Sequence, residues 1–300
     1  MPNTVLITGG TGCIGSETCR HLIDNDQFDQ IILLSRSGTN PFDHPQVSAA
    51  SADITDLDSL KNIFETNQIS HVLHSAAMRT SDCIANPKMA MDVNVQGTTN
   101  ILEASRQYIQ RFMFISTAAV YGSKEGVDTI KEDAKLEAFN PYIASKIAAE
   151  AIIEAFSKSY NFDSIIFRPQ ILFGPGRGEA GSTAGLNNAM RAAAQGKPFN
   201  IPYSSQHTFH YTRDVGRILN HCLTEKPHSN FEIYNLPGIS ASIQEMVDLM
   251  NAPIISITEK QMPFPKAIDA SLFFRHFPDI KLTKMGDAVA QTLAFYKAAT

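Results

Sequence analysis

Short apolar runs alternate with longer stretches of helical periodicity through the first 170 residues. The runs show little alternation of apolar and polar positions, which is typical of strands buried on both faces of a parallel sheet. The pattern predicts an α/β fold with a doubly wound parallel sheet. The predicted strands are 4–8, 31–34, 71–74, 111–116 and 164–167, and helices are expected through Leu22 and Ile23 and at 56–66, 89–107, 141–160 and 284–297.

The pattern changes after Arg168. Glycine and proline are frequent in 173–185, which predicts a loop and a boundary between two parts of the chain. The remainder mixes short helices, loops and further prolines, so we expect a smaller, mixed region there. We therefore predict a first domain at 1–168, to which 207–223 returns, and a second region at 169–300.

The composition narrows the class of protein. The 300 residues are 43% apolar, enough for a large core, and the formal net charge of -5 leaves no basic surplus for nucleic acid. The four cysteines have no metal-ligand spacing, and no acidic or cysteine cluster joins His207 and His210. No apolar run approaches the roughly 20 residues that cross a bilayer, and the N-terminus lacks a signal-peptide pattern. We expect a cytoplasmic protein that binds no metal, membrane or nucleic acid.

A glycine-rich turn separates the first predicted strand from the first predicted helix. Gly9, Gly12 and Gly15 lie three residues apart in TGGTGCIG. Because they lack Cβ atoms, a diphosphate can approach the backbone, and the free amides at the helix start bind its negative charge. The spacing and its place at a strand–helix junction predict a Rossmann-type dinucleotide site. Its expected residues are Gly9, Thr11, Gly12, Cys13, Ile14 and Gly15.

The end of the second predicted strand indicates which nicotinamide dinucleotide would bind. An acidic residue there holds the ribose 2′-hydroxyl of NAD, whereas an arginine accommodates the 2′-phosphate of NADP. The chain has Arg36 between two serines and no acid, which favours NADP over NAD; the alternative is a solvated surface arginine. Asp53, followed by Ile54, either contacts the adenine or caps the helix that begins near Asp56.

A tyrosine and a lysine share one face of the predicted helix 141–160. Tyr142 and Lys146 are four residues apart. A tyrosine ionises near pH 10, and a neighbouring ammonium favours the phenolate, so the pair suits acid–base catalysis. Thr117, or Ser116 beside it, ends an earlier strand and offers a hydroxyl for a substrate oxygen. The alternative is an ordinary surface pair.

With these residues the chain resembles the extended short-chain dehydrogenase/reductases, the family that includes nucleotide-sugar epimerases and dehydratases. The stretches that carry the resemblance run in family order through almost the whole chain. They are specific for the fold and for nicotinamide chemistry, and much less specific for substrate. They are TGGTGCIG, ADITD, HSAAM, DVNVQGTTNILEA, ISTAAVYG, YIASK, FRPQILFGPG, HYTRDVG and IYNLPG.

The resemblance implies roles for single residues. Thr117 would steady the substrate oxygen, Tyr142 would be the acid and base, and Lys146 would position the cofactor and lower the pKa of the tyrosine. The first domain would hold the dinucleotide, and the region 169–300 would mainly hold the substrate. Expected cofactor contacts beyond the glycine turn are Arg36, Asp53, Ile54, Ala76, Ala77, Asn94, Ser116, Tyr142, Lys146 and Arg168. Expected substrate contacts are Arg79, Gln170, Arg177 and His207.

Two departures from the family bear on the reaction. Family dehydratases carry an Asp-Glu pair after the Ser/Thr, whereas this chain has Ala118 and Ala119, so we do not expect a 4,6-dehydratase. His207 stands where nucleotide-sugar enzymes of the family often have an arginine for the diphosphate. We expect an NAD(P)-dependent epimerase or oxidoreductase that transfers hydride at a hydroxyl or carbonyl carbon of a sugar or nucleotide-sugar-like small molecule. The alternatives are an NADPH-dependent reductase or dehydrogenase of a small non-nucleotide carbonyl compound and a catalytically silent NADP-binding sensor or scaffold.

The two long predicted helices bear on assembly. In relatives, helices such as 89–107 and 141–160 pair across a two-fold axis, and here both carry extra apolar positions. The resemblance therefore implies a homodimer, whereas the alternative is that these helices only cover the sheet.

Overall fold

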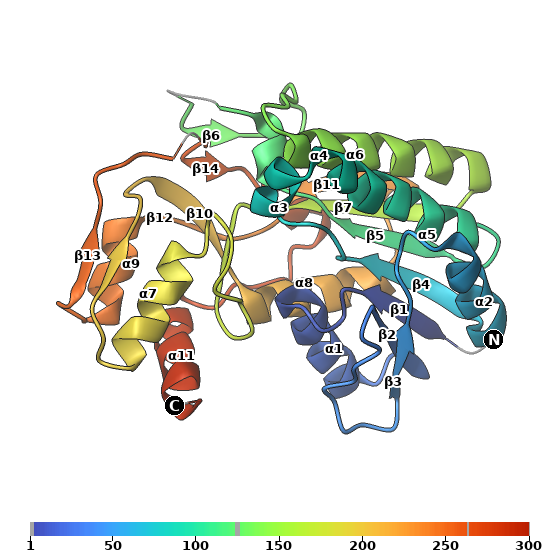
Figure 1. Cartoon of the computed structure of the whole chain (residues 1–300), viewed down its shortest axis with the longest axis horizontal. Helices are drawn as coiled ribbons and strands as arrows, with labels where there is room; N and C mark the ends of the chain where they lie inside the picture. The colour runs from blue at the N-terminus through green and yellow to red at the C-terminus, as the bar shows by residue number, and fades with distance from the viewer. Residues whose placement is uncertain (1–2, 124–126, 263, 300) are drawn as a thin grey trace.

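A seven-stranded parallel sheet forms the centre of the protein (Figure 1). The computed structural model describes residues 3–123, 127–262 and 264–299. Neighbouring strands are all parallel, in the order β11-β7-β5-β4-β1-β2-β3, so the order reverses beside β1. Doubly wound sheets bind ligands at such a reversal, outside the carboxyl ends of the strands. The strands are β1 Thr4–Thr8, β2 Gln30–Ser35, β3 Val47–Ser51, β4 Ile69–His74, β5 Arg111–Ile115, β7 Asp163–Arg168 and β11 Phe231–Asn235.

Helices cover both faces of this sheet, and each face has its own apolar core (Figure 1). One core joins α1 and α8 to the strands, and the other joins α2, α5 and α6 to the opposite face. The strands are apolar on both sides for that reason. None of the described helices is long and apolar enough to cross a membrane. The covering helices are α1 Cys13–Asn25, α2 Leu57–Asn67, α5 Gly97–Ser105, α6 Pro141–Tyr160 and α8 Thr212–Thr224.

The predicted bounds of α6 agree with the structure because both ends of the helix are marked in the sequence. The Asn140 side chain accepts a hydrogen bond from the Ile143 amide, and Pro141 occupies the first helical position. Asn161 ends the helix in the left-handed conformation, with φ of 54°. The helix is thereby fixed at the end that carries Tyr142.

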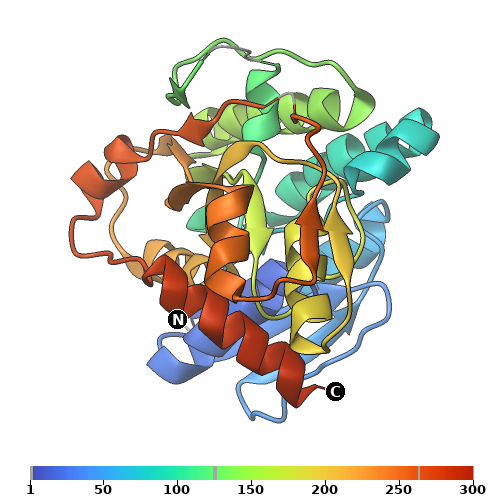
Figure 2. The same cartoon turned by 90° about the vertical axis from the view of Figure 1, so that its left-hand side faces the viewer.

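The smaller region packs short strands and helices around a third apolar core (Figure 2). In this core β10 pairs in parallel with β8 and antiparallel with β12, and β13 pairs with β9. A two-stranded sheet of β6 and β14 joins the segment before α6 to the segment before α10. The elements around this core are β8 Ile171–Phe173, α7 Gly185–Ala194, β9 Phe199–Ile201, β10 Gln206–Tyr211, β12 Ile239–Ser242, α9 Ile243–Met250, β13 Ile255–Ile257 and α11 Met285–Ala298. β6 Thr129–Ile130 and β14 Ala267–Ile268 lie in a separate small cluster, and α10 Ser271–His276 packs into the core that contains α1 and α8.

The chain crosses between the two regions several times. Within the predicted returning segment 207–223, α8 packs against α1 on the main sheet, whereas β10 belongs to the small sheet. The following β11 adds the seventh strand beside β7. The division of the chain at residue 168 stays a prediction. Elements from after that residue, such as β11, complete the main sheet that the first part forms.

The predicted helix 89–107 is not one regular α-helix, and this expectation was wrong in detail. The structure has α3 Thr80–Ala85, α4 Pro87–Ala90, a π-helical turn η1 Met91–Gln96 and then α5. A π turn inserts backbone without disturbing the run of apolar positions, so periodicity does not reveal it. The turn contains the buried Asn94.

Candidate active site

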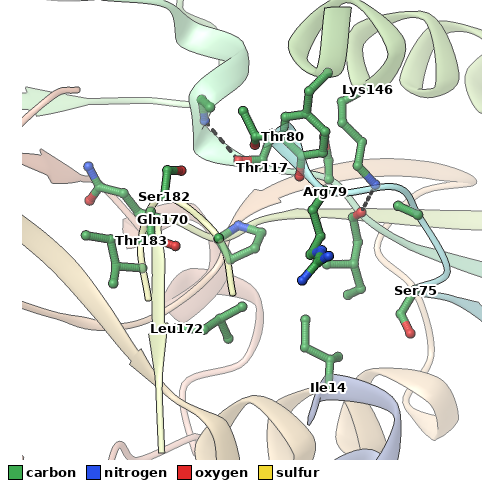
Figure 3. Close-up of a pocket in the computed structure, with 18 of the residues that line it drawn as sticks. Ile14, Ser75, Arg79, Thr80, Thr117, Lys146, Gln170, Leu172, Ser182 and Thr183 are labelled. Atoms are coloured by element: carbon green, nitrogen blue, oxygen red, sulfur yellow. Dashed lines mark hydrogen bonds between the residues drawn. The ribbon is translucent and has the colours of Figure 1, made fainter. Parts of the chain in front are cut away.

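A cavity of about 390 Å³ lies where the carboxyl ends of β1, β4 and β5 meet loops of the smaller region (Figure 3). Its walls come from the glycine turn, the segment after β4, the end of β5, α6 and the loop after β8. The structure therefore brings together residues that are far apart in the sequence. The predicted site residues that line it are Gly9, Gly12, Cys13, Ile14, Ala77, Arg79, Ser116, Thr117, Tyr142, Lys146, Gln170 and Arg177.

Other predicted site residues do not line this cavity. Some lie along the neighbouring sheet edge, where the far end of an extended dinucleotide would run, and others lie behind the lining. They are Thr11, Gly15, Arg36, Asp53, Ile54, Ala76, Asn94, Arg168 and His207.

The glycine turn is packed too closely for side chains. Gly9 has φ of 67°, and a Cβ on it would lie 3.0 Å from the Ala76 nitrogen. A Cβ on Gly15 would lie 2.6 Å from the Gly9 oxygen. The N-cap of α1 is Gly12, which has no side chain to satisfy the first amides of the helix. A turn without side chains lets a diphosphate approach the backbone, and the free amides at the helix start can bind its negative charge, so this turn fits a dinucleotide.

Tyr142 and Lys146 project from α6 into the cavity. The Lys146 ammonium donates a hydrogen bond of 2.8 Å to the Ile115 carbonyl and lies 4.4 Å from the centre of the Phe114 ring (Figure 3). Burial lowers the pKa of Lys146 to about 8 and raises the pKa of Tyr142 to about 12. A hydrogen bond with Thr117 opposes the rise at Tyr142. In this geometry the Thr117 hydroxyl favours the phenolate.

The two hydroxyls at the end of β5 face different ways. Thr117 is the N-cap of a short 3-10 helix, η2 Ala118–Tyr121, and accepts a hydrogen bond of 3.2 Å from the Ala119 amide (Figure 3). Ser116 is buried and donates its hydrogen bond to the Glu150 carboxylate. Thr117 is therefore the hydroxyl beside Tyr142, while the Ser116 hydroxyl is engaged below the cavity.

A buried ion pair lies beneath α6. The Arg168 guanidinium donates two hydrogen bonds, of 3.0 and 2.5 Å, to Glu150, and a third of 3.0 Å to the Tyr121 hydroxyl. Arg168 was expected beside the nicotinamide, but its side chain is only 2% exposed and turns under α6. Glu150 lies one turn beyond Lys146 and opposes the fall in the lysine pKa.

Asn94 connects two walls of the cavity from behind. Its side-chain oxygen accepts a 2.7 Å hydrogen bond from the Met78 amide, and its nitrogen donates one of 3.0 Å to the Ser145 hydroxyl. The segment after β4 and helix α6 are therefore held at a fixed separation.

The residues predicted for the adenosine end lie along the carboxyl edge of the sheet. Arg36 is exposed at the end of β2, and its carbonyl accepts a hydrogen bond from Ser51. Asp53 does not cap α2: its carboxylate accepts two hydrogen bonds from Thr55, and Asp56 is the N-cap. Ile54 is buried against Gly97 of α5.

Two arginines face the cavity from opposite sides. Arg79 points into its middle, with one nitrogen 3.0 Å from Asp82 (Figure 3). Arg177 donates to the carbonyls of its own loop and lies close enough to Cys13 to oppose the rise that burial gives the thiol pKa. Arg177 is thus near the helix start, where a diphosphate would bind.

Gln170 lines the cavity, and His207 lies behind it. The Gln170 side-chain nitrogen donates a hydrogen bond of 2.7 Å to the Pro265 carbonyl, and its side-chain oxygen accepts one of 2.7 Å from the Thr208 backbone amide. His207 is fully buried among Tyr203, Phe209 and Phe264, and burial lowers its pKa to about 4. A neutral, enclosed imidazole does not replace an arginine for a diphosphate.

Sequence reasoning missed part of the cavity wall. The loop after β8 contributes small and hydroxyl-bearing side chains, but its glycines and prolines indicated only a boundary. Phe264 gives no local signal, because it reaches the cavity from a distant part of the chain. The missed lining residues are Ser75, Met78, Thr80, Ala118, Ala119, Leu172, Ala180, Gly181, Ser182, Thr183 and Phe264, with Ile115 and Ile171.

Solved structures share this fold. The UDP-glucose 4-epimerase of Thermus thermophilus in complex with NAD superposes with a TM-score of 0.86 at 21% identity, covering 99% of this chain and 100% of that one. The UDP-glucuronic acid 4-epimerase of Bacillus cereus in complex with UDP-glucuronic acid and NAD gives 0.84 at 20% identity, covering 99% and 100%. At this identity the likeness establishes the fold.

Sequence relatives establish the family. A putative UDP-glucose 4-epimerase of Methanocaldococcus jannaschii is 34% identical over 83% of this chain and 82% of its own length. The dTDP-glucose 4,6-dehydratase of Neisseria gonorrhoeae is 32% identical over 57% of this chain, which spans only 55% of that relative. The model of the NAD dependent epimerase/dehydratase family matches residues 5–236. The chain belongs to the NAD dependent epimerase/dehydratase family.

Proposed function

We propose that this protein is an NAD(P)-dependent epimerase that inverts a hydroxyl-bearing carbon of a nucleotide-sugar-like substrate. The observation that carries the proposal is one cavity that joins the glycine turn to Thr117, Tyr142 and Lys146. The close backbone of the turn suits a diphosphate, and the three side chains suit proton transfer from a hydroxyl.

The residues divide the chemistry between them. A nicotinamide bound in the cavity supplies the acceptor and donor of hydride. Thr117 would hold the substrate oxygen, and Tyr142 would take the hydroxyl proton and later return it. Because burial raises the pKa of Tyr142 to about 12, the phenolate needs the Thr117 hydrogen bond and a nearby positive charge. Lys146, held by the Ile115 carbonyl, would supply that charge and bind the ribose.

Inversion requires that the keto form of the sugar turn over within the cavity before hydride returns. The wall opposite α6 is made of small side chains, Ala180, Gly181, Ser182 and Thr183, and Ala118 and Ala119 adjoin Thr117. These residues leave space and supply hydroxyls without a fixed charge, which supports rotation of an uncharged ring.

Elimination of water is less well supported. A dehydratase needs an acid that protonates the leaving hydroxyl. None of the residues that line the described cavity is Asp or Glu, and Ala118 and Ala119 stand where family dehydratases carry such a pair. We therefore favour epimerisation over dehydration.

Arg36 favours a second candidate, an NADPH-dependent reductase or dehydrogenase of a small carbonyl compound. The Arg36 side chain is exposed at the end of β2, and within the described ranges it makes no ion pair. A free guanidinium at this place suits a 2′-phosphate.

For Arg36→Ala we expect the preference for NADP over NAD to fall about tenfold, measured by titration, with Arg106→Ala as control. An unchanged preference would contradict this interpretation of the loop.

The test of the proposed function begins with cofactor carried through purification. Mass spectrometry of the protein should detect retained NAD or NADP, and proton NMR should then follow UDP- and dTDP-hexoses for inversion at a ring carbon. Tyr142→Phe should lower the rate at least about a hundredfold, the usual contribution of a positioned acid or base.

Each other outcome favours a different function. Consumption of NADPH with carbonyl compounds, without inversion of any sugar, would favour the reductase. Dinucleotide binding with no turnover of either kind would favour a sensor or scaffold, in which Tyr142→Phe has no effect on the biological role.

A further inference from the structure

His74 is a fully buried histidine behind the cavity, at the end of β4. Both ring nitrogens have partners: Nδ1 lies 2.6 Å from the Thr8 hydroxyl, and Nε2 lies 3.0 Å from the Thr98 hydroxyl. Thr8 ends β1 immediately before the glycine turn, and Thr98 lies in α5. The imidazole therefore bridges the centre of the sheet and a covering helix.

The neighbouring hydrogen bonds assign the tautomer of His74. The Thr98 hydroxyl donates its proton to the Asn94 carbonyl at 2.7 Å, so it can only accept from Nε2–H. Nδ1 is then bare and accepts from the Thr8 hydroxyl, whose oxygen accepts the Ala76 amide at 3.1 Å. Burial also lowers the pKa of His74 to about 3, so the ring stays neutral.

The hydrogen bonds continue to both functional walls. Ala76 lies between Ser75 and Ala77, which line the cavity. The Asn94 side chain accepts a hydrogen bond from the Met78 amide and donates one to the Ser145 hydroxyl. The Ser145 hydroxyl in turn donates a hydrogen bond of 2.7 Å to the Tyr142 carbonyl. The path thus runs from the end of β1, through the imidazole, to the helix that carries the predicted base.

We propose that His74 is a positioning residue that fixes the segment 75–79 against the glycine turn through Nδ1 and against the π turn and α6 through Nε2. The proposal rests on the proposed dinucleotide site, because segment 75–79 forms one of its walls. The two nitrogens have separable effects. Loss of the Nδ1 contact leaves the Thr8 hydroxyl, which accepts from the Ala76 amide, without its own acceptor beside the proposed cofactor site, whereas loss of the Nε2 contact leaves this arrangement in place.

Two substitutions separate these contacts. His74→Asn keeps an acceptor near the position of Nδ1 and loses the donor to Thr98, and His74→Gln keeps a donor near Nε2 and loses the acceptor for Thr8. We expect His74→Gln to weaken NAD or NADP binding about tenfold, since one buried hydrogen bond is disrupted at the site. We expect His74→Asn to change the affinity less than about threefold at a similar loss of melting temperature.

Isosteric threonine variants repeat the test if a histidine variant fails to fold. Thr8→Val should behave as His74→Gln, Thr98→Val as His74→Asn, and Thr292→Val, which removes a buried hydroxyl bond in α11, should leave affinity unchanged. Hydrogen exchange of peptides covering 75–79 in the cofactor-free protein should rise in His74→Gln and Thr8→Val only.

The outcomes distinguish this proposal from the proposed function. Equal loss of affinity in both histidine variants, in proportion to lost stability, or equal exchange in both, would overturn the positioning role. If the wild type binds neither dinucleotide, the proposed function fails, while the exchange measurement still decides whether His74 fixes the segment through Nδ1.

Discussion

At the scale of single residues, the charge of Lys146 depends on a carboxylate one helical turn away. Burial holds the pKa of Lys146 at about 8, below its unfolded value of 10.5, and Glu150 is the main group that opposes this fall. As pH rises, Lys146 therefore loses its proton in the folded protein before it does so in the unfolded chain. Below about pH 8 the buried ammonium lowers the free energy of unfolding, and this cost disappears as pH rises from about 8 toward 10.5.

For Glu150→Gln we expect the pKa of Lys146 to fall further, because its nearest buried negative charge is gone. If the ammonium holds the cofactor ribose, dinucleotide affinity should then be lost on the alkaline side at a pH about one unit lower than in the wild type. Titration of the affinity between pH 6 and 9 measures this.

A matched control separates charge from packing. Glu154→Gln, one turn further along α6, removes an exposed carboxylate paired with Lys158 and should leave the alkaline limit unchanged. Glu150→Gln will also lower the melting temperature, because Arg168 loses its buried partner. A melting temperature that falls while the alkaline limit stays in place would mean that Glu150 only stabilises the fold.

Residue types at the site could be read from the sequence, but side-chain directions could not. Tyr142 and Thr117 follow from their element ends, and both reach the cavity. Arg168 follows the same logic, yet its guanidinium turns under α6 because Glu150 offers a buried partner there. Its direction depends on a residue that becomes its neighbour only when β7 and α6 pack together.

At the scale of elements, the glycine turn tests how closely β1 and α1 must pack. For Gly15→Ala we expect the turn to shift, because the new Cβ would lie 2.6 Å from the Gly9 oxygen and 2.7 Å from the Gly10 Cα. Overpacking of this kind costs about 1–3 kcal/mol, and dinucleotide affinity should fall at least about tenfold. Thermal melting and titration with NAD and NADP measure the two effects.

The chain offers a matched control for this substitution. A Cβ on Gly178, in the loop after β8, would meet no atom within 4 Å. Gly178→Ala should therefore leave both the melting temperature and the affinity close to wild type. Equal effects at the two positions would mean that loss of backbone freedom, not close packing, explains the glycines.

Elements could be predicted where the sequence marks their ends. Asn140, Pro141 and Asn161 determine both ends of α6, and the prediction was confirmed residue by residue. The π turn at Met91–Gln96 has no such mark, and β10 joins the small sheet through pairing with β8 and β12, which no local pattern shows. Local preference thus predicts helices and buried strands, whereas long-range pairing decides which sheet a strand enters.

At the scale of the whole molecule, the cavity lies between the two parts of the chain. The main sheet and its helices supply the glycine turn, the segment after β4 and the face of α6 that carries Tyr142, and the smaller region supplies Gln170, Ser182, Thr183 and Phe264. The two-stranded sheet of β6 and β14 pairs the segment before α6 with a segment far along the chain. A change in how the two parts pack would therefore alter the shape of this cavity.

We propose that the chain forms a homodimer through α3, α4 and η1, which carry exposed apolar side chains. Ile84 on α3, Met89 on α4 and Met91 on η1 are 56%, 54% and 36% exposed, although large apolar side chains are more often buried. The same helices adjoin α6 (Figure 1), so a second copy placed here would bury them beside that helix.

For Met89→Asp we expect dissociation, because a carboxylate would be buried in an apolar interface without a partner. Light scattering after size exclusion should give twice the 32.9 kDa chain mass for the wild type and a dissociation constant raised at least about tenfold for the variant. Leu249→Asp, at a side chain 43% exposed on α9, controls for the loss of an exposed apolar group and should remain dimeric. A wild type that stays monomeric at all concentrations, or equal dissociation of both variants, would contradict this interface.

If Met89→Asp dissociates and still binds dinucleotide as the wild type does, the dimer is not required to form the cofactor site, as expected from a cavity lined by one chain.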